Sequence, residues 1–230
     1  QKLGKIIKIG IPAGIQSCAM NLSNAFLQSG VNSFGNDAIA GSTAVSTVES
    51  LLWVTLTSFV NAATTFVSKN VGAGKIERVN KIVFTTISMT AVLGIVLGLG
   101  SFALSDPIMS IFIKDNPVAV QYGYDRLKIT FPIYFLAGIM GVLPGAVRGL
   151  GYSTAPSLIA IFGACGIRIV WIYTIFKMYP SLTTLYLVHP ITWVITSVAL
   201  TINYIICYKL VKKRIKGPSV SEKEELAYQT

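Results

Sequence analysis

Two rows of polar side chains run through the first two apolar stretches of the sequence, and one carboxylate stands among them. In the first stretch, polar residues recur at steps of three or four: Ser17, Asn21, Asn24, Gln28 and Asn32. In the second stretch, the same steps connect Ser46, Glu49, Trp53, Thr57 and Asn61. Residues at these spacings share one face of a helix, so each row predicts a polar stripe along a helix.

Both stripes are surrounded by residues that suit the hydrocarbon of a membrane. Hydrocarbon cannot hydrogen-bond to amide and hydroxyl groups, so the stripes must face protein or water. For any single Ser, Thr or Asn, a hydrogen bond between helices is a sufficient explanation. Two stripes that converge on one carboxylate favour a hydrated cavity instead.

Glu49 stands within about four residues of the middle of its apolar stretch, which is roughly 6 Å along a helix axis. An acid near the centre of a membrane span is costly to insert and marks a functional site by default. Desolvation favours its protonated form and a nearby cation favours its ionised form, so this group can exchange a proton for Na⁺ or for a cationic substrate. Two other interpretations stay open. One is a structural ion pair with Arg168, the only other charge deep in a predicted span, and the other is a neutral, hydrogen-bonded acid.

The composition identifies the elements that position these residues. Of 230 residues, 53% are hydrophobic and only 12% are charged, about half the charged fraction of a soluble protein. Apolar segments of this length are too long for barrel strands, so they predict helices. We therefore expect an all-α membrane protein with six transmembrane helices in residues 1–216, followed by a polar, disordered tail in 217–230. The expected spans are about 6–34, 38–67, 81–104, 118–147, 155–178 and 185–211.

The basic residues predict how the chain is oriented in the membrane. Counted by loop, fourteen lysines and arginines fall on one side and four on the other, namely Lys114, Arg126, Lys128 and Lys177. The side richer in Lys and Arg is cytoplasmic, so both ends of the chain are expected in the cytoplasm. Basic residues in short loops contact lipid head groups, and they form no aromatic-interleaved stripe typical of nucleic-acid binding.

The sequence contains no set of residues that predicts catalysis or metal binding. Its three cysteines and one histidine lack metal-ligand spacing, and no nucleophile motif or phosphate loop is present. We expect neither an enzyme nor a protein with a cofactor.

Four parts of the sequence resemble one lobe of the multidrug and toxic compound extrusion (MATE) transporters. Residues 9–13, with Gln16, are similar to the opening of the first helix of a lobe. Residues 63–74 are similar to the end of its second helix and the cytoplasmic Gly-Ala-Gly loop. Residues 148–151 are similar to the loop after its fourth helix, and Arg168 matches an arginine often seen in its fifth.

This resemblance implies a twelve-helix transporter built from two six-helix lobes, of which this chain is similar to the C-terminal lobe. It also implies export of organic, often cationic, compounds across the plasma membrane in exchange for inward H⁺ or Na⁺. The N-terminal lobe is then the missing partner, alongside membrane lipid. Some branches of the family carry acids in the seventh and tenth helices, whereas here Glu49 stands at the eighth-helix position.

The leading expectation is thus half of an antiporter, with Glu49 as the group that couples transport to an ion. The substrate cavity is expected to be lined by Gln16, Asn21, Asn24, Gln28, Ser46, Trp53, Thr57, Asn61 and Arg168. One alternative is a flippase of the same superfamily for a lipid-linked sugar or precursor. Such a flippase needs several cationic side chains in its cavity, and the sequence offers Arg168 with Arg148 at the mouth. Another alternative is a membrane scaffold whose polar stripes are contact surfaces.

Overall fold

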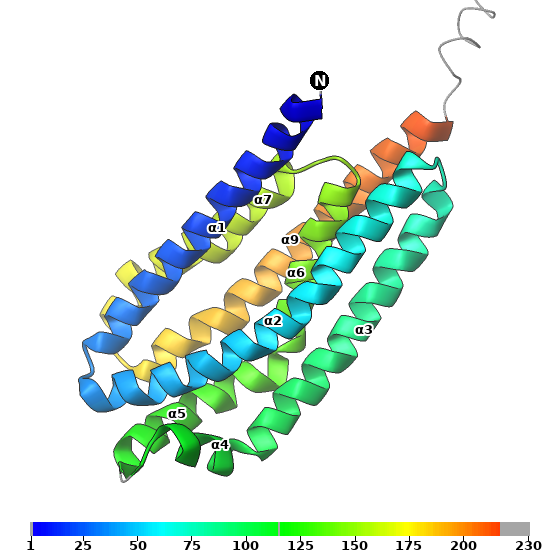
Figure 1. Ribbon diagram of the computed structural model, residues 1–230. Coiled ribbons are helices and arrows are strands. Elements are labelled where there is room, and N and C mark those ends of the chain that lie inside the picture. The colour runs from blue at the N-terminus through cyan, green and yellow to red at the C-terminus, as the bar shows by residue number, and fades with distance from the viewer. Residues whose placement is uncertain (1, 115, 217–230) are drawn as a thin grey trace, which may run out of the picture.

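The chain folds into a bundle of long helices that run roughly lengthwise past one another (Figure 1). The computed structural model describes residues 2–114 and 116–216, and this part of the chain contains no strand. The expected tail in 217–230 lies outside the described residues. In chain order the elements are α1 (Lys2–Asn32), α2 (Asn36–Gly72), α3 (Ile76–Ala103), α4 (Ser105–Phe112), α5 (Pro117–Thr130), η1 (Phe131–Ile133), α6 (Phe135–Gly149), α7 (Thr154–Ala160), η2 (Ile161–Gly166), α8 (Ile167–Trp171), η3 (Ile172–Phe176) and α9 (Leu182–Lys216).

Several of these elements, alone or joined end to end, are apolar and long enough to cross a membrane. In the described residues, four stretches qualify by length and composition: Asn36–Gly72, Ile76–Ala103, Thr154–Phe176 and Leu182–Ile215. A fifth span is the bent pair Pro117–Ile133 and Phe135–Gly149. The 31-residue helix α1 is long enough but is not among them, because its polar stripe interrupts its apolar sequence. With α1 included, the expected all-α, six-helix membrane lobe is confirmed.

The fourth span is bent by 53° where α5 meets α6. The 3₁₀ turn η1 lies at this bend and contains Pro132, which has no N–H to continue the helical hydrogen bonds. The bend places Tyr134 directly after the break, where its side chain turns toward α2. The fourth span is therefore kinked at Pro132 rather than straight.

The fifth span is not a regular α-helix either. Two π-helical stretches, Ile161–Gly166 and Ile172–Phe176, enclose the five residues of α8. Wider turns of this kind often occur at functional sites. Here they enclose the single turn of α-helix that carries Arg168.

The helices form two groups, and the space between the groups is the important feature. One apolar core joins α2, α3, α5, α6 and α9, with Leu56, Phe131 and Leu200 fully buried in it. Helix α1 packs mainly against α7 and η2, beside which it lies in Figure 1. A smaller apolar cluster, which includes Leu27, Val31 and Tyr186, fastens the end of α1 to the start of α9.

Candidate functional site

A cavity of about 850 Å³ lies between α1 and α2, and residues of α5, α6, α7, η2, α8 and α9 complete its walls. The two polar stripes meet here, because α1 and α2 face each other across it. The cavity is lined by nine of the ten residues proposed from the sequence: Gln16, Asn21, Asn24, Gln28, Ser46, Glu49, Trp53, Thr57 and Arg168.

Asn61 is the exception, because it does not line the cavity as the expected stripe predicts. Its side chain is exposed, and Val60 lines the cavity at this level instead. An α-helix advances by about 100° per residue, so twelve residues after Glu49 the direction has rotated by about 120°. A stripe drawn at steps of three and four drifts around the helix, and Asn61 has drifted off the cavity face.

Glu49 forms an ion pair with Arg126 of α5, not with Arg168. Nη2 of Arg126 lies 2.6 Å from Oε2 of Glu49. The sequence-based placement of Arg126 in an outer loop, and the alternative pair of Glu49 with Arg168, are therefore both wrong. Arg126 stands nine residues inside α5 and is buried, with 7% of its surface exposed.

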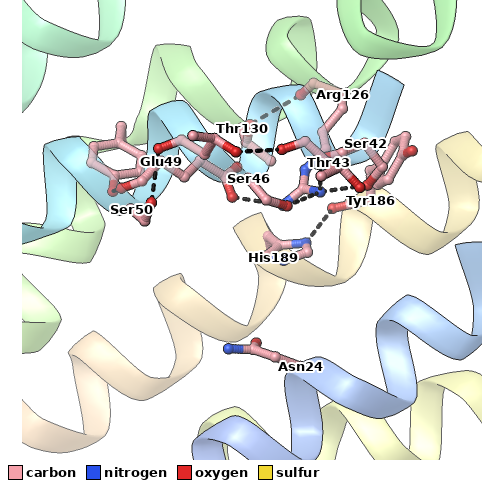
Figure 2. Close-up of polar contacts among 12 residues, drawn as sticks. Asn24, Ser42, Thr43, Ser46, Glu49, Ser50, Arg126, Thr130, Tyr186 and His189 are labelled. Atoms are coloured by element: carbon pink, nitrogen blue, oxygen red, sulfur yellow. Dashed lines mark hydrogen bonds and ion pairs between the residues drawn. The ribbon is translucent and has the colours of Figure 1, made fainter. Parts of the chain in front are cut away.

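Arg126 is held by acceptors that come from a single face of α2 (Figure 2). Its Nη1 donates to the carbonyl oxygen of Ser42 at 3.0 Å, to the hydroxyl of Ser42, and to the hydroxyl of Ser46 at 2.8 Å. The guanidinium carbon also lies 5.6 Å from the ring centre of Tyr186 on α9. The two helices come this close because Gly41 faces Ala119 and Gly123 of α5.

One carboxylate oxygen of Glu49 has no hydrogen-bond partner in the described part of the chain. Oε2 accepts from Arg126, but the buried Oε1 has no hydrogen-bond partner among these residues. The backbone carbonyl of Glu49 accepts from the hydroxyl of Tyr134 at 2.9 Å, which joins the bend of the fourth span to α2. The side chain as a whole is 18% exposed and lines the cavity, whereas Oε1 itself is buried.

Two further arginines line the same cavity, and each donates to an amide of α1. Nη1 of Arg168 donates to Oδ1 of Asn24 at 2.7 Å, and Nη2 of Arg148 donates to Oε1 of Gln16. Neither arginine forms an ion pair with an acid of the described residues, and Nε of each is buried without a partner there. The amide stripe of α1 is therefore an acceptor surface for these arginines.

His189 is a cavity residue that the sequence did not identify. It lines the cavity and packs edge-on against Trp193, with the two ring centroids 6.0 Å apart. Figure 2 shows it on α9 between the row of α2 side chains and Asn24 of α1. The signal available was that Tyr186, His189 and Trp193 recur at steps of three and four, which puts them on one face.

The site lacks the usual ligands of a tightly bound metal ion. Within residues 2–114 and 116–216, no three His, Cys, Asp or Glu side chains are grouped closely enough to hold one. Any ion bound here would use Glu49 together with hydroxyl, amide or carbonyl oxygens.

Comparison with known proteins identifies one family. A family model described as MatE matches residues 12–174. Among curated proteins, "Probable multidrug resistance protein YoeA" of Bacillus subtilis is 26% identical over 164 residues, which are 71% of this chain and 35% of the relative. "Probable multidrug resistance protein YpnP" of the same organism is 29% identical over 146 residues, 64% of this chain and 33% of the relative.

A solved structure shares the fold. The Vibrio cholerae MATE transporter VcmN in its bent form superposes with a TM-score of 0.84 at 17% identity. The match covers 94% of this chain and 48% of that one. The chain thus spans about a third of the length of the curated relatives and about half of the solved transporter.

Proposed function

This chain belongs to the MatE family, and we propose that it forms one six-helix lobe of a secondary transporter that exports organic compounds in exchange for H⁺ or Na⁺. The cavity between α1 and α2 is then the part of the transport route that this lobe contributes. The half-length match to a solved transporter supports the presence of a second lobe in the working protein. The basic end of α9 supports its assignment as the C-terminal lobe, with both ends of the chain cytoplasmic.

The observation that carries this proposal is the Glu49–Arg126 pair on the cavity wall. An ionised Glu49 attracts Arg126 and fastens α5 to α2. A proton or Na⁺ on the carboxylate weakens that attraction, because the positive charge of Arg126 is then no longer balanced. Ion binding at one wall residue therefore changes the energy of a contact between two spans, as exchange between two access states requires.

The test is Glu49→Gln in the full two-lobe transporter, reconstituted in vesicles with a pH or Na⁺ gradient. The amide keeps the size of the side chain but cannot exchange a proton or bind Na⁺ as a carboxylate does. We expect ion-driven export to be lost. Glu77→Gln, at the start of α3 outside the cavity, is the matched control and should transport normally.

A second variant separates coupling from stability. Glu49→Gln alone leaves Arg126 buried without its counter-charge, which destabilises a protein by about 3–5 kcal/mol for a fully buried pair and by less for this partly exposed one. Glu49→Gln combined with Arg126→Gln removes both charges, so the Tm should recover while coupling stays absent. Full-rate, gradient-dependent export by either variant would overturn the role proposed for Glu49.

The charge of the cargo is a separate question. A cationic compound, which the family resemblance implies, has to compete with Arg126 for Glu49. The flippase alternative requires several cationic side chains in the cavity, and Arg126, Arg148 and Arg168 meet that requirement. This observation favours cargo with an anionic group as a second candidate.

A further inference from the structure

We propose that the cavity of this lobe binds the anionic group of its cargo, a carboxylate or phosphate carried by an amphipathic organic molecule, and that Arg168 is the central binding residue. This inference rests on the proposed transport function and names the class of substrate. It differs from the cationic cargo expected from the sequence.

The charges that line the cavity do not balance. Three arginines face one acid, Glu49, and Arg126 already occupies that acid. Arg148 and Arg168 are left without a negative partner among the described residues. The cavity wall of this lobe therefore carries two uncompensated positive charges, which repel a cation and attract an anion.

Arg168 is too deeply buried for bulk water to solvate its positive charge. Only 3% of its surface is exposed, and α8 holds it in the middle of the fifth span. A guanidinium offers five N–H donors, yet the structure gives it one neutral acceptor, Oδ1 of Asn24, and leaves Nε unpartnered in the described part of the chain. A charge kept inside a membrane span at this cost is retained for function, and the planar fork of Arg fits a carboxylate or phosphate.

Arg148 and Arg168, the two arginines without an acidic partner in the described part of the chain, lie at different depths along the cavity. Their partners on α1, Gln16 and Asn24, are eight residues apart, which is about 12 Å along the helix axis. One small anionic group cannot contact both at once. Arg148, at the end of α6, is therefore placed to receive or release the anion, and Arg168 to bind it deeper in the membrane.

The same cavity also offers a surface for an apolar body. Trp53, Met140 and Trp193 line its wall opposite α1. Aromatic and Met side chains suit flat or irregular organic groups, since they give large contact areas that can adapt in shape. An amphipathic anion matches this combination better than a small inorganic ion does.

The experiment measures binding and transport by the intact two-lobe protein. The probes are carboxyfluorescein as a soluble organic anion, ethidium as an organic cation, and a polyprenyl pyrophosphate as a lipid-linked anion. The variants are Arg168→Gln, Arg168→Lys and, as matched control, Arg78→Gln, because Arg78 is exposed near the start of α3 and does not line the cavity.

We expect Arg168→Gln to weaken carboxyfluorescein binding at least tenfold and Arg168→Lys to weaken it less, because lysine keeps the charge but loses the fork. Arg78→Gln should bind as the unmodified protein does, and ethidium should not compete with carboxyfluorescein. If the polyprenyl pyrophosphate binds in an Arg168-dependent way and carboxyfluorescein does not bind, the anion site stands and its source is lipid-linked cargo.

Two results would overturn the inference. In one, ethidium is exported under a gradient while neither anion binds, which leaves the proposed transport function intact and removes the anionic cargo. In the other, Arg168→Gln lowers the Tm of the intact protein but leaves anion binding unchanged, which makes Arg168 a structural residue rather than the binding residue. Failure of all gradient-driven export, with carboxyfluorescein binding retained, would instead contradict the proposed function alone.

Discussion

At the scale of single residues, Arg126 is the group that organises the cavity wall. It donates hydrogen bonds to three residues of α2, namely Ser42, Ser46 and Glu49, which are spaced by four and three residues and so lie on one helix face. Its two terminal nitrogens have different acceptors, since Nη1 donates to the serine oxygens and Nη2 donates to the carboxylate. A planar guanidinium can do this in one fixed orientation, whereas an ammonium group cannot.

Arg126→Lys tests this reading. Lysine keeps the positive charge opposite Glu49 but cannot serve Ser42, Ser46 and the carboxylate together. We expect a loss of about 1–3 kcal/mol in the free energy of unfolding, the range for hydrogen bonds removed at charged groups. Thermal unfolding of the purified protein in detergent measures it, with Arg214→Lys on the exposed end of α9 as the control. Equal Tm values for Arg126→Lys and the unmodified protein would contradict the assignment.

The sequence predicted the stripes at the residue level but not the partner of Glu49. The stripes follow from helical spacing alone, so the sequence is sufficient to assign Asn24 and Glu49 to one cavity, which both residues line. Arg126 lies only nine residues into its helix, and position along the chain favoured a solvent-exposed loop. Its burial depends on how closely α5 approaches α2, which is a property of tertiary packing.

At the scale of elements, the α2–α5 contact depends on the absence of a side chain at Gly41. A Cβ built there lies 2.3 Å from the carbonyl oxygen of Ala119 and 2.8 Å from the backbone nitrogen of Gly123. Both atoms belong to the backbone, so they cannot move aside without shifting α5. The position of Arg126 one turn further along depends on this close approach.

Gly41→Ala should therefore separate α5 from α2. We expect destabilisation of about 1–3 kcal/mol, typical of overpacking, together with impaired coupling because Arg126 moves away from Glu49. Gly100→Ala on α3 is the matched control, since nothing lies within 4 Å of its added Cβ. That control should be neutral or stabilising by up to about 1 kcal/mol through helix propensity. A Gly41→Ala protein with an unchanged Tm and normal export would show that the contact tolerates a methyl group.

The irregular spans show how far an apolar pattern predicts an element. The long hydrophobic runs indicate that a helix exists, because only helices and closed barrels satisfy the backbone inside a membrane. A proline within such a run is a common cause of a kink, and the 53° bend lies at Pro132. The π-helical turns around Arg168 left no comparable signal, since the choice between α and π turns depends on packing against α1 and α9.

At the scale of the whole molecule, the lobe consists of one group of helices around a large apolar core and a second group with fewer buried apolar contacts. Helices α2, α3, α6 and α9 share the large apolar core. Helix α1 packs against α7 and η2 and contacts α9 through the smaller apolar cluster. Polar and charged contacts cross the space between them: Asn24 with Arg168 and Gln16 with Arg148. Such contacts can exchange partners with water or cargo more readily than an apolar core can repack, so this cavity is where movement within the lobe is expected.

Hydration of that cavity is the property on which both proposals depend, and it can be measured directly. In the intact two-lobe protein, with Cys18, Cys165 and Cys207 replaced by Ala, Asn21→Cys places a thiol on the cavity wall without breaking a contact of Arg168. We expect a membrane-impermeant maleimide to label it, because a thiol reacts as its thiolate and needs water to ionise. Phe84→Cys, at a 74% exposed apolar position on α3, is the matched control and should stay unreactive in hydrocarbon. If Asn21→Cys is as inert as Phe84→Cys in both gradient directions, the polar stripes are contact surfaces of a scaffold rather than the wall of a transport route.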